Sequence, residues 1–267
     1  MYKPINHSPL KLLAWRLAYR HWTRRIARRA EPLDVLSLGR VVVISPHQDD
    51  ETIACGALLA TLAAAKKTPQ VVFVTDGANS HQGHPTFNPS ALVALRRSEA
   101  LTALAALGLS GAQMHELGAP DGEMQAFAAG RGTYFSAKLA SLLDGLEPDT
   151  VLIPFCQEGT LDHEAVNALC LEALALTVRK PAVLQFVVWA KWSDRGRKLL
   201  LNVPEKLYYL PLGEHAAVKN KALDAHASQV HPSPPWNFSV LEERFVELAR
   251  VDAELFVAFA PATSTSA

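Results

Sequence analysis

The sequence lacks the features typical of exported, membrane-spanning and dinucleotide-binding proteins. Its three cysteines form no CxxC pair, and an odd number leaves no complete disulfide framework for an exported domain. No run of about 18 apolar residues is present to span a bilayer, and arginines interrupt the N-terminal stretch where a signal peptide needs a continuous apolar region. The first predicted strand leads into PHQDDE and not into a GxGxxG phosphate loop. We therefore expect a cytoplasmic protein that is neither secreted nor membrane-spanning.

Charge is also scarce. Charged residues make up 19% of the 267 residues and the formal net charge is zero, which argues against disorder and against a nucleic-acid partner. Hydrophobic residues make up 49%, enough for the core of one α/β domain. The balance is uneven, because residues 1–30 contain eight basic residues and no acidic one, leaving 18 basic and 26 acidic residues in the remainder.

Residues 1–32 are predicted to form a basic helical extension. Between Leu10 and Ile26, apolar residues recur at roughly helical spacing and basic residues fill much of the rest. Two interpretations stay open. The helix either packs on the body with a solvated basic face, or contacts an anionic partner such as the inner face of the membrane. The oligomeric state cannot be predicted from these patterns.

Short β-branched runs alternate with Ala- and Leu-rich segments through residues 33–260. Residues 41–45 are apolar on both faces, which predicts a buried parallel strand, and a helix and a second strand follow at 52–65 and 71–75. The alternation predicts one α/β domain, a three-layer Rossmann-like fold with a mostly parallel sheet. Residues 261–267 are expected to be a disordered tail. The further predicted elements are helices near 90–107, 136–146, 162–178 and 214–228, strands at 151–154, 183–189 and 207–210, a turn at 231–235, and a last helix and strand ending at 259.

An imidazole and adjacent carboxylates follow the first strand, where open α/β sheets place their ligands. His47, Asp49 and Asp50 lie in this segment. Zinc accepts imidazole nitrogen and carboxylate oxygen, and catalytic zinc sites use three protein ligands. One aspartate can bind the metal while the other serves as general base. The alternative is that Asp49, Asp50 and Glu51 only cap the next helix and complement its positive end.

A second acid-and-histidine segment, residues 159–164, follows the strand at 151–154 and opens a helix. If the sheet is parallel, both segments emerge at one edge, and His163 becomes the third ligand that the first segment lacks. Asp162 can then orient a ligand histidine by hydrogen bonding to the ring nitrogen that does not bind the metal. The sequence therefore predicts a zinc site.

The motifs PHQDDE and LDHEAVN resemble the PIG-L/LmbE family of zinc-dependent N-acetylglucosamine deacetylases, whose usual first motif is HPDDE. The likeness runs from about residue 41 to 229 and includes VTDG, RRSEA, LGAPDG and HASQ in order. It implies removal of an N-acetyl group from a sugar conjugate, leaving acetate and a free amino sugar. The residues that it implies are His47, Asp50 and His163 as zinc ligands, Asp49 as general base, and Arg96 and Asp121 as the holders of sugar hydroxyls. A surface helix charge and a turn aspartate are the alternative interpretations of Arg96 and Asp121.

Thr160 is the main departure from the family pattern. Many members have a histidine three residues before the second zinc histidine, and it stabilises the oxyanion or protonates the leaving amine. Thr160 cannot carry a proton at neutral pH, so either another histidine substitutes, or zinc and Asp49 carry both steps, or the activity is weakened or altered. Gln48 replaces the common proline without removing a ligand. The substitute candidates are His81, His84, His226 and His231, with Thr160, Asp162 and His226 as candidate oxyanion or supporting groups.

Two other functions stay open. Zinc–water chemistry does not select its substrate, so a zinc amidase acting on another acyl amide is one alternative. A non-catalytic sugar-binding protein is the other, favoured by Thr160 but disfavoured by the presence of Asp49. The sequence does not indicate which group is attached to the sugar. It does not fix the metal either, because iron also binds this set of ligands.

Overall fold

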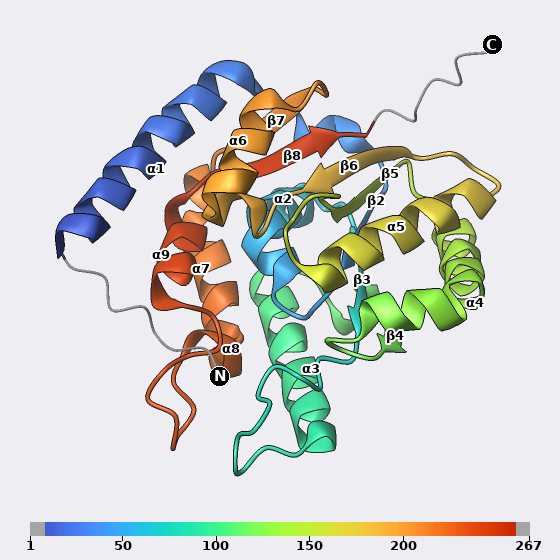
Figure 1. Cartoon of the computed structure of the whole chain (residues 1–267). Coiled ribbons are helices and arrows are strands. Elements are labelled where there is room, and N and C mark those ends of the chain that lie inside the picture. Colours follow the sequence, from blue (N-terminus) through green and yellow to red (C-terminus); the bar gives the residue numbers. More distant parts are fainter. Residues whose placement is uncertain (1–8, 260–267) are drawn as a thin grey trace.

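An eight-stranded sheet forms the middle layer of the computed structural model, which describes residues 9–259 (Figure 1). The strand order is β1-β7-β8-β6-β5-β2-β3-β4. Strand β8 runs antiparallel to β6 and β7, and the other paired strands are parallel, which confirms the predicted mostly parallel sheet. The strands are β1 (Glu31–Pro32), β2 (Val41–Ser45), β3 (Gln70–Thr75), β4 (Met114–Ala119), β5 (Thr150–Pro154), β6 (Ala182–Phe186), β7 (Leu207–Leu210) and β8 (Glu254–Ala258).

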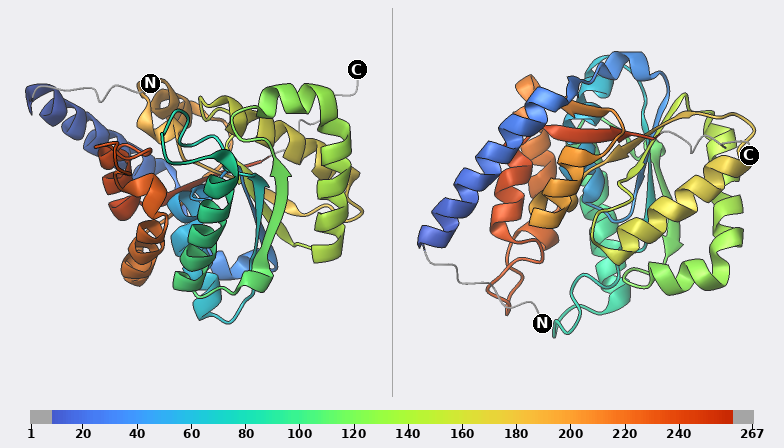
Figure 2. Two further views of the ribbon diagram at one scale, coloured as in Figure 1. Left: turned by 90° about the horizontal axis from the view of Figure 1, so that it is seen from below. Right: turned by 45° about the horizontal axis from the view of Figure 1, so that its top comes forward.

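Helices cover both faces of the sheet, as the three-layer prediction requires. Alternation along β5 shows the two sides, because Leu152 packs into one hydrophobic cluster and its neighbours Val151 and Ile153 into another. In the left view of Figure 2, β4 lies between α3 and α4. One face carries α2 (Asp50–Ala64), α3 (Pro89–Ala106), α7 (Ala216–Ala225) and α9 (Glu243–Val251), and the other carries α4 (Met124–Leu146), α5 (Leu161–Leu176), α6 (Asp194–Asn202) and α1 (Pro9–Arg29). The short helices are α8 (Ala227–Val230), η1 (Val35–Leu38), η2 (Gly111–Gln113), η3 (Ala190–Trp192) and η4 (Gly213–His215).

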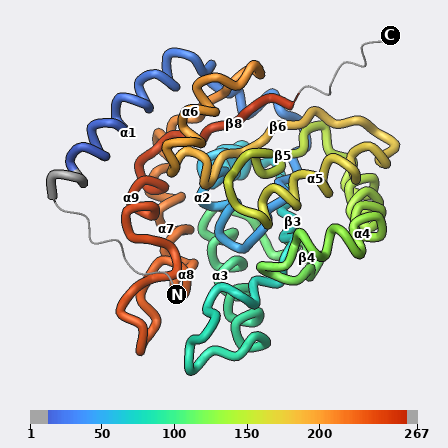
Figure 3. Tube along the Cα trace, in the orientation of Figure 1, coloured from blue at the N-terminus to red at the C-terminus, as the bar shows by residue number. Residues whose placement is uncertain are grey.

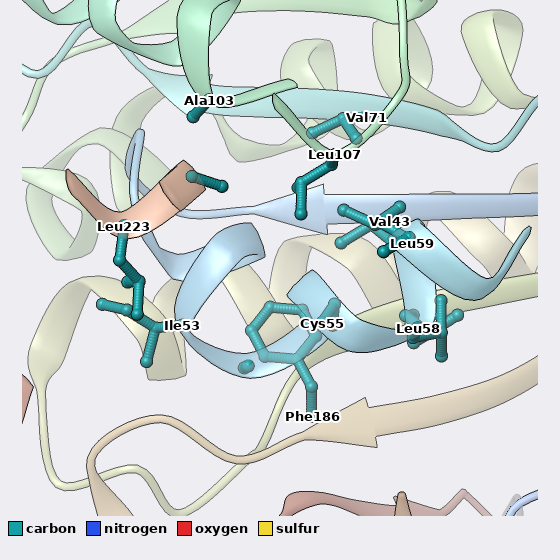
Figure 4. Close-up of a cluster of buried hydrophobic side chains, with 14 of the residues drawn as sticks. Val43, Ile53, Cys55, Leu58, Leu59, Val71, Ala103, Leu107, Phe186 and Leu223 are labelled. Atoms are coloured by element: carbon teal, nitrogen blue, oxygen red, sulfur yellow. The ribbon is translucent and has the colours of Figure 1, made fainter. Parts of the chain in front are cut away.

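Helix α2 is buried on nearly all sides, and this fixes the start of the helix. Val43 of β2, Leu58 of α2 and Phe186 of β6 are each fully buried in one cluster (Figure 4). A helix that is apolar all round belongs in the interior of a protein. Asp50, the first residue of α2, is therefore held rigidly at the end of β2.

Besides the two-residue strand β1 and the short 3-10 helices, strand β4 and helix α6 were not predicted from the sequence. Strand β4 lies at the sheet edge, where Glu116 and other exposed side chains interrupt any apolar run. Helix α6 is rich in charged residues, and its short apolar face gives a weak helical pattern. In both cases the polar residues of the solvent-exposed face obscure the sequence pattern. The buried face nevertheless stabilises the strand or helix.

Other predicted boundaries were wrong. Helix α4 begins at Met124 and not near residue 136, because packing against α5 stabilises a first half that contains two glycines. The strand predicted at 183–189 ends at Phe186, where the backbone bends so that Val188 N–H donates to Glu158. The helix predicted at 214–228 is divided at His226 into α7 and α8. The predicted tail at 261–267 lies outside the described residues.

Helix α1 forms as predicted, and only part of its apolar sequence pattern is buried. Tyr19, Trp22 and Ile26 are buried against the body, whereas Leu13 and Leu17 are 54% and 57% exposed. The buried residues follow a spacing of three and four, which places them on one side of a helix. Helix α1 therefore packs on the body of the protein, as the first interpretation predicted. The second interpretation, contact with a membrane, depends on the two exposed leucines. No helix in residues 9–259 is long and apolar enough to cross a bilayer.

A buried ion pair contacts the backbone in the middle of α2. The Glu254 carboxylate accepts from the N–H groups of Ala57 and Leu58 at 2.6 and 3.0 Å. Lys219 Nζ donates to the Ile53 carbonyl and to Glu254, both at 2.8 Å. Both charged side chains are at most 1% exposed. The pair therefore ties α7 and β8 to the helix that begins with Asp50.

Lys219→Met is expected to cost about 3–5 kcal/mol of folding free energy, because it leaves a buried carboxylate without its cation. Urea unfolding measures this change. Lys206→Met is the matched control, since Lys206 pairs with Glu31 at the surface and its loss should change stability far less. Equal small losses in the two variants would contradict a structural role for the buried pair.

Candidate active site

Both predicted motifs meet at one edge of the sheet. Strands β2 and β5 are paired parallel neighbours, so their carboxyl ends lie side by side. Each strand leads through a short loop into a helix, β2 into α2 and β5 into α5, a path that Figure 3 traces. His47, Asp50 and His163 are brought together by this arrangement.

These three side chains have the spacing of ligands that share an ion. Asp50 Oδ2 lies 3.2 Å from His47 Nδ1 and 3.2 Å from His163 Nε2. Two ligand atoms at about 2.1 Å from a tetrahedral ion are roughly 3.4 Å apart. His163 is 1% exposed, and neither of its ring nitrogens makes a hydrogen bond within the described chain. A buried imidazole without a partner fits a metal ligand, so the set suits zinc.

A second set of carboxylates contacts the other nitrogen of His47. Nε2 lies 3.1 Å from Asp121 Oδ1 and 3.3 Å from Asp162 Oδ2, and the three residues form an alternative candidate metal group. Asp162 also accepts from the N–H groups of Gly122 and Met124, and Asp121 accepts from that of Asn79. Because the first set contains His163, a buried imidazole that makes no hydrogen bond within the described residues, we favour that set as the metal centre and Asp162 as the group that orients His47.

The pKa values of the ligands reflect this arrangement. Burial alone would lower the pKa of His47, but the carboxylates of Asp121, Asp162 and Asp50 raise it well above its usual range. Burial would raise the pKa of Asp50, yet His163 and His47 hold it well below its usual range. The carboxylates therefore stabilise positive charge at this point, which a bound cation would also supply.

Asp49 is turned toward the cavity. It occupies the N-cap position of α2, but its side chain makes no capping hydrogen bond, so the capping interpretation does not explain it. Asp49 Oδ2 lies 3.5 Å from Arg96 Nη2. Burial raises the pKa of Asp49 to about 6, with Arg96 offsetting part of the change. A carboxylate of this kind can take up a proton near neutral pH, as a general base must.

Glu51 contacts Asp49, and His226 contacts Glu51 in turn. Glu51 Oε2 accepts from the Asp49 N–H at 3.0 Å, and Glu51 Oε1 lies 3.3 Å from His226 Nε2. Burial alone would lower the pKa of His226, but Glu51 raises it. Glu51 was not among the predicted site residues beyond the start of the helix, although its place in PHQDDE was the signal available. His226 contacts Glu51 and does not line the cavity.

The cavity at this edge has a volume of about 540 Å³, within the usual range for small-molecule sites. Four carboxylates and one guanidinium line it, an excess of negative charge that favours a cation. Arg96 is 3% exposed, and its Nη2 donates to the Gln48 carbonyl at 2.9 Å. It is not the surface charge of the alternative interpretation. Lining residues that the sequence analysis did not assign are Asn79, Ser80, Gly159, Leu161, Trp189, Gln229, Val240 and Leu241.

The substitute histidines lie elsewhere. His81 and His84 pack with Trp236 in an aromatic cluster, and burial lowers the pKa of His81 to about 4. His231 is exposed. None of the four candidates lines the cavity as described. Thr160 does line it, as the N-cap of α5 whose buried hydroxyl neither caps the helix nor finds another partner among residues 9–259.

A buried carboxylate suited to act as a general base, beside a candidate metal centre, is the arrangement used in metal-assisted hydrolysis, and that is the class of enzyme that this fold and site define. Residues 42–174 match the PIG-L family, described as GlcNAc-PI de-N-acetylase. The chain thus carries a PIG-L family domain, which confirms the resemblance seen in the motifs. Comparison with curated protein sequences gave no match.

Solved structures of the same fold include several deacetylases. Teicoplanin deacetylase matches as a triple mutant with a TM-score of 0.62 and in a zinc-inhibited form with 0.61, each at 18% identity over 85% of this chain and 100% of that one. The N,N'-diacetylchitobiose deacetylase from Pyrococcus horikoshii gives 0.57 at 17% identity, over 85% and 81%. The 4-carboxy-2-hydroxymuconate hydratase of Pseudomonas putida KT2440 gives 0.62 at 18% identity, over 85% and 100%. At these identities the likeness establishes the fold, and the fold serves more than one reaction.

Proposed function

We propose that this protein is a zinc-dependent deacetylase that releases acetate from an N-acetylglucosamine-type sugar conjugate. The observation that carries the proposal is the placement of Asp49, a buried carboxylate with a raised pKa, beside the set of His47, Asp50 and His163. The family match and the deacetylases of the same fold support the reaction class. An ion held by the set would lower the pKa of water and polarise the acetamido carbonyl.

Asp49 is the proton carrier of the proposed reaction. It takes one proton from the attacking water as the oxygen joins the carbonyl carbon, and it gives that proton to the sugar nitrogen as the carbon–nitrogen bond breaks. Acetate and a free amine result. With no imidazole among the lining residues besides His47 and His163, Asp49 serves both steps. Thr160 lines the cavity, and its hydroxyl, which has no hydrogen-bond partner among residues 9–259, is the proposed donor to the oxygen that gains negative charge.

Asp121 and Arg96 are proposed to hold the sugar hydroxyls. Asp121→Asn is expected to lower kcat/KM about tenfold or more, chiefly through KM, because a charge-assisted hydrogen bond becomes a neutral one. Deoxy sugars provide the control. For the analogue that lacks the hydroxyl held by Asp121, the variant and the original protein should perform alike. An equal loss on every analogue would instead place Asp121 with His47 as a metal-site residue.

The substrate itself is identified by an acyl and aglycone panel. The zinc-loaded protein is incubated with N-acetyl, N-propionyl and longer N-acyl glucosamines, free and conjugated, and the released acid is quantified. Preference for acetyl supports the proposal, whereas preference for another acyl group indicates the amidase alternative. Saturable sugar binding with no acid released would indicate a sugar-binding protein.

The exposed face of α1 supports a separate proposal, a peripheral contact of this cytoplasmic enzyme with anionic membranes. Leu13 and Leu17 project from a helix rich in arginine. The paired change of both leucines to serine is expected to weaken sedimentation with anionic vesicles about tenfold or more, because apolar area no longer enters the lipid. Leu36→Ser, at a leucine that is 51% exposed elsewhere, is the control. Unchanged vesicle binding in the paired variant would remove the idea.

A further inference from the structure

A second cavity, of about 290 Å³, lies where α1 packs beside β7 and β8. It shares no lining residue with the candidate active site. Trp22 and Ile26 of α1 form one wall, and Tyr209 and Leu255 of the sheet face them. All four lie outside residues 42–174, the part that matches the PIG-L family. In Figure 1, α1 runs along the α6, α9 and β8 side of the molecule, away from α4 and α5.

Lys191 is the unusual residue of this cavity. It lies in η3, is 4% exposed and lines the cavity, yet its ammonium makes no hydrogen bond or ion pair with any residue that the structure describes. Asp252, the acid of the same cavity, instead accepts a hydrogen bond from Tyr19. The other deeply buried lysine, Lys219, has a carboxylate partner. Burial lowers the pKa of Lys191, with Asp252 offsetting part of the change.

The Lys191 side chain is largely buried and lines the cavity without a carboxylate partner, so an anionic ligand would offset the cost of partly desolvating its ammonium. The remaining walls are largely apolar. At about 30 Å³ for each water, the cavity has room for roughly ten waters or an alkyl chain of similar volume. Arg24, exposed at the lining, adds a second positive charge from α1. The volume of the cavity, its apolar walls and its positive charges together indicate an anionic ligand with an alkyl chain.

We propose that this cavity binds a medium-chain alkyl carboxylate. The carboxylate pairs with Lys191, and the chain packs between Trp22 and Ile26 on one side and Leu255 on the other. The N-terminal helix thereby forms a ligand site that the PIG-L family domain at residues 42–174 does not supply by itself. This site does not depend on the proposed reaction, because the two cavities are separate.

The test is calorimetric titration of the full-length protein with sodium decanoate below its micelle concentration. The expected result is one saturable site. Lys191→Met keeps the length of the side chain and removes its charge, and it should weaken binding about tenfold to a hundredfold while leaving the fold intact. Hexanoate should bind more weakly than decanoate, by about fourfold for each methylene lost. Decan-1-ol, which lacks the charge, should bind as weakly to the original protein as decanoate does to the variant.

Two further variants test whether decanoate binds in this cavity and not at the candidate metal centre. Ala27→Trp, at an exposed position that lines the cavity, should block decanoate by filling the space. Asp50→Asn should leave the titration unchanged, which excludes carboxylate binding at the candidate metal centre. Equal decanoate affinity in the original protein and in Lys191→Met would overturn the proposal, as would the absence of a saturable site. Loss of binding in Asp50→Asn would assign the ligand to the metal centre and also overturn it.

Discussion

Replacing Asp49 by asparagine is expected to lower kcat for acetate release by about 10²–10⁴-fold while zinc still binds stoichiometrically. Asparagine has nearly the same shape but cannot accept the proton that the attacking water must lose. The carboxylate is buried, is not needed as the helix cap and has a pKa raised to about 6 by its burial. Steady-state kinetics and metal analysis on the same preparation measure the two quantities together.

Asp224→Asn is the control, since it makes the same chemical change at a half-exposed pair with Arg250. Its kcat should stay close to that of the original protein. If Asp49→Asn retained full zinc and lost less than about tenfold in kcat, another group would be the base, and the assignment of both proton steps to Asp49 would be wrong.

Removal of His163 is expected to abolish zinc binding and activity together. In His163→Ala the zinc affinity should fall by more than the 10–100-fold typical of residues that only orient a ligand. Asp162→Asn should show that smaller effect, because Asp162 contacts His47 and backbone N–H groups. Competition with a chromophoric chelator measures both affinities. His115→Ala, at a histidine on β4 that bonds to Gln70, should leave zinc binding unchanged.

The comparison of these two variants distinguishes the candidate metal groups. If Asp162→Asn lost zinc completely while His163→Ala retained it, the ion would belong to the group of His47, Asp121 and Asp162. His163 has no hydrogen bond to lose within residues 9–259, so its removal should affect the metal more than the fold. Thermal unfolding of the metal-free variants checks that distinction.

The central part of the site could be predicted because it is encoded locally. His47, Asp49 and Asp50 follow a strand that is apolar on both faces, and His163 follows its direct neighbour in the sheet. A parallel sheet brings such segments to one edge, so two strand–loop–helix patterns suffice to predict their meeting. The wrong boundaries did not affect this result, since the helices after these two strands begin within two residues of the predicted positions.

The cavity walls could not be predicted in the same way. Trp189 follows a strand whose end was misplaced, and Val240 and Leu241 lie in a long loop without periodicity. Their positions depend on contacts between distant segments, such as the Glu158 carboxylate that holds the backbone of residues 188–190. Lys191 gave no sequence signal either, because a lone lysine is ordinarily solvated. Only the folded structure shows that its side chain is buried.

The most direct test of the account is hydrolysis of an N-acetylglucosamine conjugate by the zinc-loaded protein in ¹⁸O-labelled water. Equal amounts of acetate and free amino sugar are expected, with one labelled oxygen in each acetate, and product should form about 10²–10⁴-fold more slowly with Asp49→Asn. Saturable binding of the conjugate to the zinc-loaded protein, with no acetate released, would contradict it.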